Sequence, residues 1–227
     1  MDVIIVGAGG HGKVVLDILR AGGRHVPIGF IDADVTLAGS SVGELKVVGP
    51  ANMLPKLRQR KVKGAIIAIG DNRTRMRYAR LLQEQGFELI NAVHPTASVS
   101  PSAILGANVV IAAQSVICTE ARIEDSVVIN TGAIVDHECI VHEGAFIAPG
   151  VCLAGRVRIG AGAFVGLGAN VIQCLSIGQY AVIGAGAAVI ADVADYATAV
   201  GVPARVIKID GPTPPTPADS DLESQVA

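Results

Sequence analysis

The chain has 227 residues, of which 51% are hydrophobic but only 3% aromatic, and its formal net charge is −2 at pH 7. The scattered Lys and Arg residues provide no basic surface for nucleic acid. Although the mean hydropathy is +0.52, no apolar run approaches the roughly 18 residues of a membrane-spanning helix, and no basic segment opens a signal peptide, so we expect a soluble, cytoplasmic protein without a membrane or nucleic-acid partner.

Residues 1–95 alternate between strand and helix patterns. Short apolar runs predict strands at Val3–Val6, Val26–Ile31, Ala65–Ile69 and Phe87–Val93. Apolar residues at helical spacing predict one helix that ends at Gly22-Gly23 and another over Arg73–Gln85. This alternation predicts an α/β domain of Rossmann-like type, a small parallel sheet flanked by helices.

A glycine-rich turn joins the first predicted strand to the first helix. Gly7, Gly9 and Gly12 fit the spacing G-x-G-x-x-G, and Asp32 ends the second strand about twenty residues further on. Such glycines let backbone N–H groups and a helix N-terminus approach a diphosphate, while the acidic residue can hold a ribose hydroxyl. Because about 95 residues hold only half of a dinucleotide fold, we expect a nucleotide diphosphate with a different far end. A purely structural tight turn is the alternative.

From about residue 99 the pattern becomes a repeat of six. Aliphatic residues recur every six positions from Leu105 to Val189, fifteen times in succession, and a small or β-branched residue follows four positions after nearly all of them. This period fits neither a helix nor a plain strand; it predicts a parallel β-helix with three six-residue faces, about eighteen residues, in each triangular coil. Glycines directly after the aliphatic, such as Gly106 and Gly166, indicate a positive φ or a close backbone approach.

The composition changes again after the repeat. Asp192 and Asp195 interrupt the pattern, and residues 211–227 are rich in Pro, Asp and Ser. We therefore predict a domain over residues 1–95, a β-helix over residues 96–209 and a disordered tail over residues 210–227. The narrow interior of the β-helix has no room for large rings, so Phe146 and Phe164 are expected to point outward.

Asp136, His137 and Glu138 form an acidic–histidine–acidic run inside the repeat. Their place in the hexad lies on the outer surface of the predicted coil, so the histidine is expected to be uncrowded. A neighbouring carboxylate can fix the tautomer of a histidine and raise its basicity, which makes His137 a candidate general base. A solvated surface histidine is the alternative. No cluster has metal-ligand spacing, and the four cysteines, which form no C-x-x-C pair, are expected to be reduced thiols.

Together these motifs resemble a known family. A βαβ domain opening V-G-A-G-G-H-G-K, an unbroken hexapeptide array containing D-H-E, and the ending G-V-P-A-R are similar to the bacterial hexapeptide acyltransferases over residues 1 to about 209. The most similar group holds sialic acid O-acetyltransferases and nucleotide-amino-sugar N-acetyltransferases, which act on UDP-4-amino sugars of the bacillosamine type or on GDP-perosamine. The resemblance implies a left-handed β-helix, a homotrimer, and acetyl-CoA held between neighbouring helices, with no metal.

The resemblance also implies roles for the residues that match the family's motifs. His137 would be the general base and Glu138 would tune it, so that an amine attacks the thioester directly without an acyl-enzyme. The residues expected to bind the nucleotide sugar are Gly9, Gly10, His11, Gly12, Lys13, Asp32, Gly70 and Asn72. The residues expected along the coenzyme are Phe146, Gly155, Leu167, Ala185, Gly201, Pro203 and Arg205. Two of them depart from the family, because Phe146 stands where many members carry a second histidine and Ala185 replaces a common glycine.

The leading hypothesis is an acetyl-CoA-dependent N-acetyltransferase that acts on a 4-amino-4,6-dideoxyhexose linked to UDP, GDP or dTDP. A sialic acid O-acetyltransferase on the same fold is the first alternative. The glycine motif also permits an NAD-dependent oxidoreductase, which the missing second half of the sheet disfavours. A non-catalytic trimeric sensor of nucleotide sugars is a further alternative.

Overall fold

The computed structural model describes residues 1–212, which form two compact units, one spanning Met1–Ala92 and one beginning at Val93. The tail that the sequence predicts to be disordered, residues 210–227, lies outside the described residues except for its first three positions. No helix within residues 1–212 is long and apolar enough to cross a membrane.

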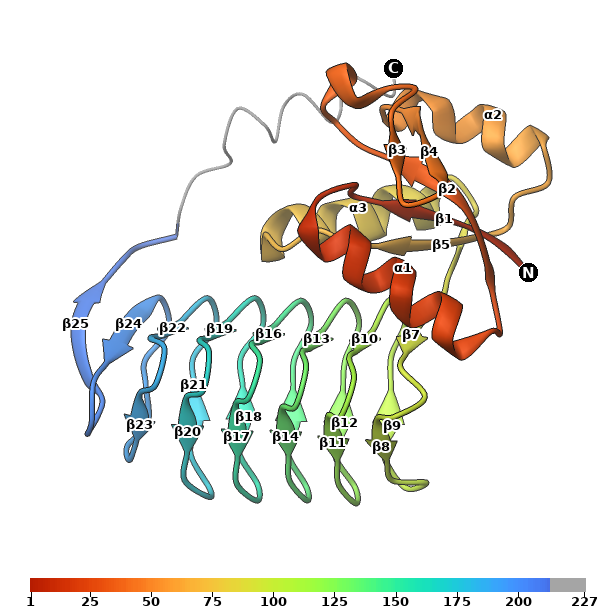
Figure 1. Cartoon of the computed structure of the whole chain (residues 1–227). Helices are drawn as coiled ribbons and strands as arrows, with labels where there is room; N and C mark the ends of the chain where they lie inside the picture. Colours follow the sequence, from red (N-terminus) through yellow and green to blue (C-terminus); the bar gives the residue numbers. More distant parts are fainter. Residues whose placement is uncertain (213–227) are drawn as a thin grey trace. The chain divides into compact units, whose positions relative to one another are not determined.

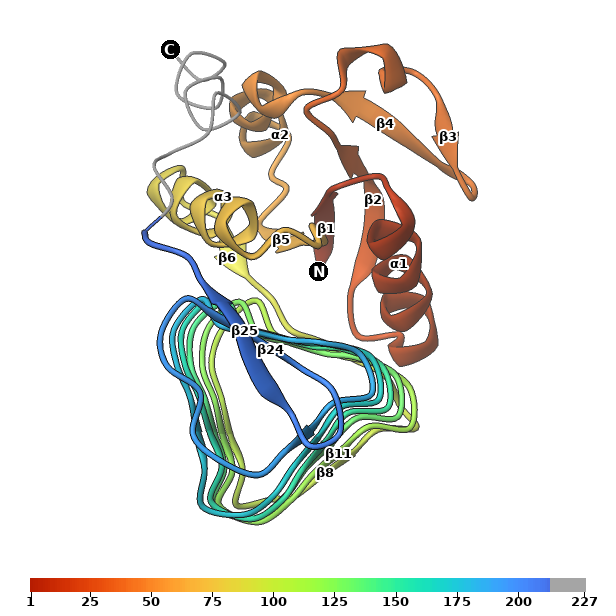
Figure 2. The same cartoon turned by 90° about the vertical axis from the view of Figure 1, so that its left-hand side faces the viewer.

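The first unit is built on a six-stranded sheet with the order β3-β4-β2-β1-β5-β6, parallel except for the antiparallel β3–β4 pair. Its strands are β1 (Asp2–Val6), β2 (Val26–Ile31), β3 (Ser41–Val42), β4 (Leu45–Gly49), β5 (Gly64–Ile67) and β6 (Glu88–Leu89). Its helices are α1 (Gly10–Gly22), α2 (Leu54–Gln59) and α3 (Asn72–Glu84), with 3-10 turns at Val35–Leu37 and Ala51–Met53. Helices α2 and α3 pack on one face of the sheet and α1 covers the other (Figure 2).

Local chemistry sets the ends of the two longer helices. Gly23 adopts a left-handed conformation with φ of 64° and donates its N–H to Leu19 O, which ends α1 where the sequence predicts. The side chain of Asp71 accepts a hydrogen bond from the Thr74 N–H at 2.8 Å, which caps the start of α3. The Asp71 cap places the N-terminus of α3 a short turn after β5, at the carboxyl edge of the sheet.

The sequence-based elements of this unit are confirmed with one exception. The expected strand Phe87–Val93 is wrong as a single element, because it divides into β6 and β7 (Ala92–Val93). Ile90 donates its N–H to Ala65 O in the sheet of the first unit, whereas His94 donates to Ile111 O in the second unit. The chain therefore changes sheets between these two residues. The short β3–β4 hairpin and α2 were not predicted.

The second unit is the predicted parallel β-helix of left-handed type, in which each strand pairs with the strand eighteen residues later, as Val110 does with Val128 (Figure 1). Seen along its axis, each coil is a triangle with strands on its sides and turns at its corners (Figure 2). Three sheets run along these sides.

The first sheet consists of β7, β10 (Val110–Ile111), β13 (Val128–Ile129), β16 (Phe146–Ile147), β19 (Phe164–Val165), β22 (Val182–Ile183), β24 (Ala197–Val200) and β25 (Arg205–Ile209). The second consists of β8 (Ser98–Val99), β11 (Val116–Ile117), β14 (Ile134–Val135), β17 (Cys152–Leu153), β20 (Asn170–Val171) and β23 (Ala188–Val189). The third consists of β9 (Ile104–Leu105), β12 (Arg122–Ile123), β15 (Ile140–Val141), β18 (Arg158–Ile159) and β21 (Ser176–Ile177).

The six-residue repeat supplies the core of this unit. Every repeat aliphatic from Ile111 to Val189 is at most 2% exposed, and the small residues between them, such as Ala133 and Ala145, are fully buried. All seven aromatic residues of the chain lie in the first unit or on the outer positions of the second, so the expectation of an aliphatic prism is confirmed. Stacked aliphatics of similar size fill the narrow coil without voids.

The turns correct one detail of the repeat. Left-handed residues occur three positions after the repeat aliphatic, for example Asn108 with φ of 56° and Glu138 with φ of 57°. The glycines directly after the aliphatic have no positive φ; instead, a Cβ on Gly166 would lie 2.6 Å from Ile183 O of the next coil. Of the two reasons expected for these glycines, close approach is confirmed and positive φ is wrong.

The array ends where the sequence pattern breaks. Ile183 pairs with Ala199 after sixteen residues instead of eighteen, and Asp192 accepts a hydrogen bond from the Ser176 N–H at 2.8 Å. Strand β25 then reverses direction and pairs antiparallel with β24. The parallel stacking therefore stops at an antiparallel strand.

Candidate active site

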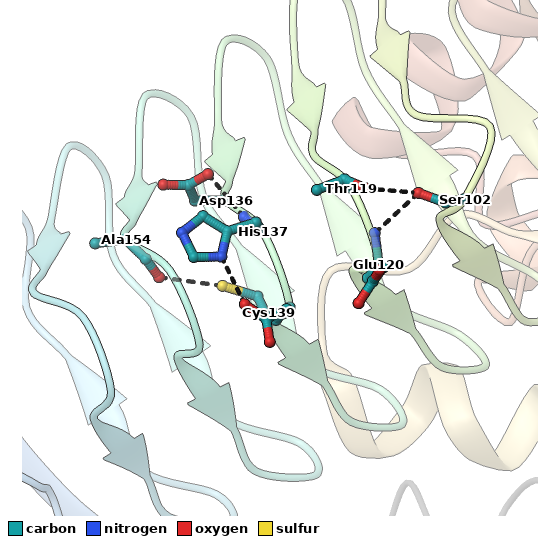
Figure 3. Close-up of polar contacts among 8 residues, drawn as sticks. Ser102, Thr119, Glu120, Asp136, His137, Cys139 and Ala154 are labelled. Carbon is teal, nitrogen blue, oxygen red and sulfur yellow. Dashed lines mark hydrogen bonds and ion pairs between the residues drawn. The ribbon is translucent and has the colours of Figure 1, made fainter.

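His137 lies in the turn between β14 and β15, on one corner of the β-helix (Figure 3). Its Nδ1 is 2.9 Å from Oε2 of Glu138, and its backbone N–H donates to Oδ1 of Asp136 at 2.7 Å. The side chains of His137 and Glu138 are 44% and 46% exposed, so the histidine can meet a ligand. With Nδ1–H directed at the carboxylate, Nε2 carries the lone pair and can accept a proton.

Gly155 leaves the space that this imidazole occupies. It follows His137 by one coil, and a Cβ on it would lie 2.5 Å from Cε1 and 3.1 Å from Cδ2 of the ring. Any side chain at this position would displace the imidazole. The expected absence of crowding around His137 therefore depends on this one residue.

Two thiols near the histidine are held in their protonated form. Burial raises the pKa of Cys139 to about 11, and its Sγ donates to Ala154 O at 3.1 Å. Burial also raises the pKa of Cys118, helped by a hydrogen bond to Asp136 and by the negative charge of that carboxylate. Because the thiolate is the nucleophilic form, neither cysteine is activated for covalent catalysis.

A second histidine–glutamate pair lies on a different corner and was not predicted. His142 Nδ1 is 3.0 Å from Oε1 of Glu124, one coil earlier, and the other oxygen of Glu124 accepts from the Glu143 N–H. The pair joins neighbouring coils, whereas His137 and Glu138 are adjacent in sequence. Eighteen-residue spacing between the two side chains is the signal that could have found it.

The first unit contains a pocket of about 490 Å³ at the carboxyl edge of its sheet. The predicted residues that line it are Gly9, Gly10, His11, Asp32 and Gly70. The predicted residues that do not line it are Gly12, Lys13 and Asn72. Gly7, the first glycine of the motif, also lines it, and the lining residues missed by the sequence analysis are Val6, Ala33, Ala68, Ile69, Thr74 and Tyr78. Most of these follow from the rule that ligands of parallel sheets bind at the carboxyl ends of the strands.

The glycines of the turn have two different functions. A Cβ on Gly12 would meet the carbonyl group of Gly7, so this glycine is required for packing. A Cβ on Gly9, Gly10 or Gly70 would meet no described atom within 4 Å. Packing does not explain these three glycines, which leave open space where they line the pocket. No described side chain caps the N-terminus of α1, so its first backbone N–H groups are available to an anion.

Burial changes the titration of two groups that line this pocket. Burial, together with the smaller effect of the positive charge of Arg75, lowers the pKa of His11 to about 4, so the imidazole is neutral at neutral pH. Burial raises the pKa of Tyr78, and the charge of Asp32 adds to this. The carboxylate of Asp32 accepts from the Ala8 N–H at 2.7 Å and the Asp34 N–H at 3.0 Å. It therefore links two turns of the pocket, in addition to the ribose contact expected from the sequence.

The residues expected along the coenzyme fall on two corners of the β-helix. Gly155 shares the corner of His137, whereas Leu167 and Ala185 occupy equivalent exposed positions on the corner between the first and second sheets. Gly201, Pro203 and Arg205 lie in the exposed segment around β25. Phe146 stacks on Phe164 with ring centroids 5.4 Å apart, on the outer side of β16 and β19 as predicted. Within residues 1–212, no group of His, Cys, Asp and Glu residues is arranged to hold a metal ion.

The chain is similar to a known domain family and to a curated acetyltransferase. A family model described as the PglD N-terminal domain matches residues 2–82. The UDP-N-acetylbacillosamine N-acetyltransferase of Bacillus subtilis strain 168 is 37% identical over 115 residues, which are 49% of this chain and 51% of that protein. In this alignment the chain spans about half the length of its curated relative.

Solved structures match nearly the whole chain. PerB from Caulobacter crescentus, in complex with CoA and GDP-perosamine, is 41% identical with a TM-score of 0.88, and the match covers 92% of this chain and 98% of that one. The GDP-perosamine N-acetyltransferase of the same organism also matches in a form with one histidine replaced by alanine. The acetyltransferase domain of PglB from Neisseria gonorrhoeae, in complex with acetyl coenzyme A, is 35% identical with a TM-score of 0.85, covering 91% of this chain and 98% of that one.

Proposed function

The chain belongs to the PglD- and PerB-type family of nucleotide-amino-sugar N-acetyltransferases, and from this premise we propose that it transfers the acetyl group of acetyl-CoA to the amine of a 4-amino-4,6-dideoxyhexose linked to UDP, GDP or dTDP. The observation that carries the proposal is the exposed His137, paired with Glu138 and left unobstructed by Gly155. We further propose that residues 1–95 bind the nucleotide sugar, that residues 96–209 bind acetyl-CoA, and that the enzyme acts as a homotrimer in the cytoplasm.

The pocket of the first unit supports a nucleotide diphosphate as ligand. Its floor is made by Gly9 and Gly10 at the start of α1, where backbone N–H groups and the positive end of the helix dipole favour an anion. Apart from the carboxylate of Asp32, its lining is uncharged, because His11 is neutral at neutral pH and the phenol of Tyr78 stays protonated. GDP-perosamine, which is bound in the PerB structure, is a ligand of this kind, with a diphosphate between a nucleoside and a sugar.

In the proposed reaction His137 acts as the general base. Its Nε2 accepts a proton from the sugar amine while the amine nitrogen bonds to the carbonyl carbon of the thioester. The carbon–sulfur bond then breaks, and the imidazolium returns the proton to the departing thiolate. Glu138 fixes the tautomer through Nδ1, and the raised pKa values of Cys118 and Cys139 agree with direct attack rather than an acyl-enzyme.

The placement of the coenzyme residues supports a site shared between copies. His137 and Gly155 lie on one corner of the triangle, whereas Leu167 and Ala185 lie on the next. The outer face of the second sheet separates these corners. A coenzyme that touches both sets is therefore best accommodated between two neighbouring β-helices, which agrees with the homotrimer that the family resemblance implies.

The decisive experiment follows thiol release from acetyl-CoA with a panel of UDP-, GDP- and dTDP-linked 4-amino sugars. Sialic acid serves as the comparator for O-acetylation, and NADH absorbance tests for an oxidoreductase. We expect turnover on one or more of the amino sugars and acetylation of the amine, identified by mass spectrometry. Turnover on sialic acid without turnover on any amino sugar would overturn the proposal.

A further inference from the structure

Arg75 is the one charged side chain that is fully buried among the described residues. It lies on the inner face of α3, in a helix whose other arginines, Arg73, Arg77 and Arg80, are at least partly exposed. Burial lowers the pKa of Arg75 to about 10, so it remains charged at neutral pH. A buried charge is costly, whereas a well-packed apolar side chain of the same size would avoid the cost. The guanidinium therefore requires an explanation.

The guanidinium holds the turn that leads into α3. Its Nη1 donates to Ile69 O at 2.9 Å and to Gly70 O at 3.2 Å, and its Nη2 donates to Asn72 Oδ1 at 2.7 Å. Ile69 and Gly70 line the pocket of the first unit. The planar fork of an arginine can make these bonds at once, whereas the single ammonium of a lysine cannot reproduce their geometry. Arg75 thus fixes one wall of the pocket from behind.

The charge of Arg75 also acts on the pocket. The acceptors Ile69 O, Gly70 O and Asn72 Oδ1 are neutral groups. The acidic residue that acts on the guanidinium, Asp71, is exposed at the start of α3. Its field reaches His11, whose protonation it opposes. The other ionisable groups lining the pocket are Asp32 and Tyr78. A buried cation beside an open anion cradle raises the affinity for a negatively charged ligand, because low-dielectric surroundings screen it weakly.

We propose that Arg75 is a positioning residue for the anionic part of the substrate: it fixes the turn over residues 69–72 and supplies buried positive charge behind the pocket. This inference rests on the proposed function in taking a nucleoside diphosphate as the ligand. No lysine or arginine is among the residues lining the pocket. We therefore assign the preference for an anionic ligand to Arg75, which lies behind the lining.

The test separates the charge of Arg75 from its hydrogen bonds. Arg75→Met removes both, Arg75→Lys keeps the charge but loses the fork, and Arg80→Met removes an exposed arginine from the same helix as a control. Each variant is first compared with the wild type by thermal denaturation. Binding of GDP, UDP and dTDP is then measured by calorimetry, and the His11 imidazole is titrated by NMR, with its signal assigned from a His11→Gln variant.

We expect nucleoside diphosphate binding to weaken at least about tenfold in Arg75→Met. The His11 midpoint should rise only part of the way from about 4, because burial is the larger cause of its lowered pKa and remains. In Arg75→Lys the His11 midpoint should stay low while binding weakens about three- to tenfold. Arg80→Met should change neither quantity.

A folded Arg75→Met variant with wild-type binding and wild-type His11 titration would overturn the inference. If that variant does not fold, Arg75→Lys decides, since an unchanged affinity there would contradict the role of the fork. Should the wild type bind none of GDP, UDP and dTDP, each measured by calorimetry, the proposed function fails instead. The His11 titration would then still show whether the charge of Arg75 controls this site.

Discussion

The imidazole of His137 lies against the bare Cα of Gly155 one coil later, where a Cβ would be 2.5 Å from Cε1 of the ring. The ring is thus positioned on one side by its bond to Glu138 and on the other by the absence of a side chain. The position of the proposed base therefore depends on the glycine eighteen residues later as well as on the histidine itself.

Gly155→Ala should displace the imidazole without unfolding the β-helix. A shift of this kind, on the order of 1 Å, costs about 10²-fold in kcat for a catalytic group. Gln173→Ala, at the same turn position one coil further on, is the matched control and should keep wild-type activity. Steady-state kinetics and thermal denaturation of the three proteins provide the measurement. Wild-type kcat in Gly155→Ala would contradict the steric role.

His137→Asn should lower kcat by about 10²- to 10⁴-fold, the usual contribution of a general base. The fold should remain intact, because the side chain is partly exposed and its hydrogen bond runs to the neighbouring, also exposed Glu138. His142→Asn is a matched control, since His142 has an equivalent bond to Glu124 at 3.0 Å on another corner. Equal losses in the two variants would indicate a structural rather than a catalytic effect.

Replacing Cys118 and Cys139 together by Ser and Ala should leave kcat within about threefold of the wild type, because both thiols are held protonated. Mass spectrometry of the wild type after incubation with acetyl-CoA alone should reveal no acetyl adduct on either cysteine. An adduct that forms and is then discharged by the amino sugar would instead establish a covalent route.

Two glycines of the first turn should respond in opposite ways. Gly10→Ala adds a methyl group in open space at the start of α1, so it should stabilise the protein by about 0.5–1 kcal/mol while raising KM for the nucleotide sugar about tenfold. Gly12→Ala places a Cβ against the carbonyl group of Gly7 and should destabilise by at least about 1–3 kcal/mol. Thermal denaturation and KM distinguish them, and an unchanged KM in Gly10→Ala would argue against an anion at this turn.

The stability of the first unit should decrease as the pH falls from about 6.5 to 4. The pKa of His11 is lowered to about 4 in the folded protein, so below 6.5 the unfolded chain takes up a proton that the folded protein does not. The stabilisation is complete above 6.5 and lost progressively down to 4, by at most about 3 kcal/mol. His11→Gln should flatten this slope in urea titrations at several pH values. An equal slope in both proteins would show that a group other than His11 causes the loss of stability.

The sequence predicts the β-helix in detail because its period is fixed by backbone geometry. A strand of two residues and a turn recur every six positions, so counting from Leu105 locates each strand and the exposed turn of His137. Counting also brings Gly155 beside His137. The left-handed positions were missed because Asn, Glu, Ser, Arg and Tyr occupy many of them where glycine would be expected.

The pocket of the first unit could be predicted only in part. The glycine turn and Asp32 are adjacent to strand ends and follow from the motif. Arg75 and Tyr78 were not predicted. Arg75 does lie on the apolar side of α3, but a charged residue is rarely fully buried, so the sequence alone favours an exposed arginine. Only the packing of this helix against the sheet shows that Arg75 points inward and that its guanidinium binds the turn over residues 69–72.

The fixed coil length also constrains how this half of the chain can change. A single residue inserted between His137 and Gly155 would bring Ala154 beneath the imidazole and shift every later aliphatic out of the interior. Only the gain or loss of a whole coil, about eighteen residues, preserves both the core and the corner on which the histidine lies. The β-helix can therefore lengthen or shorten only by whole coils if the histidine is to keep its corner and the aliphatics their place in the core.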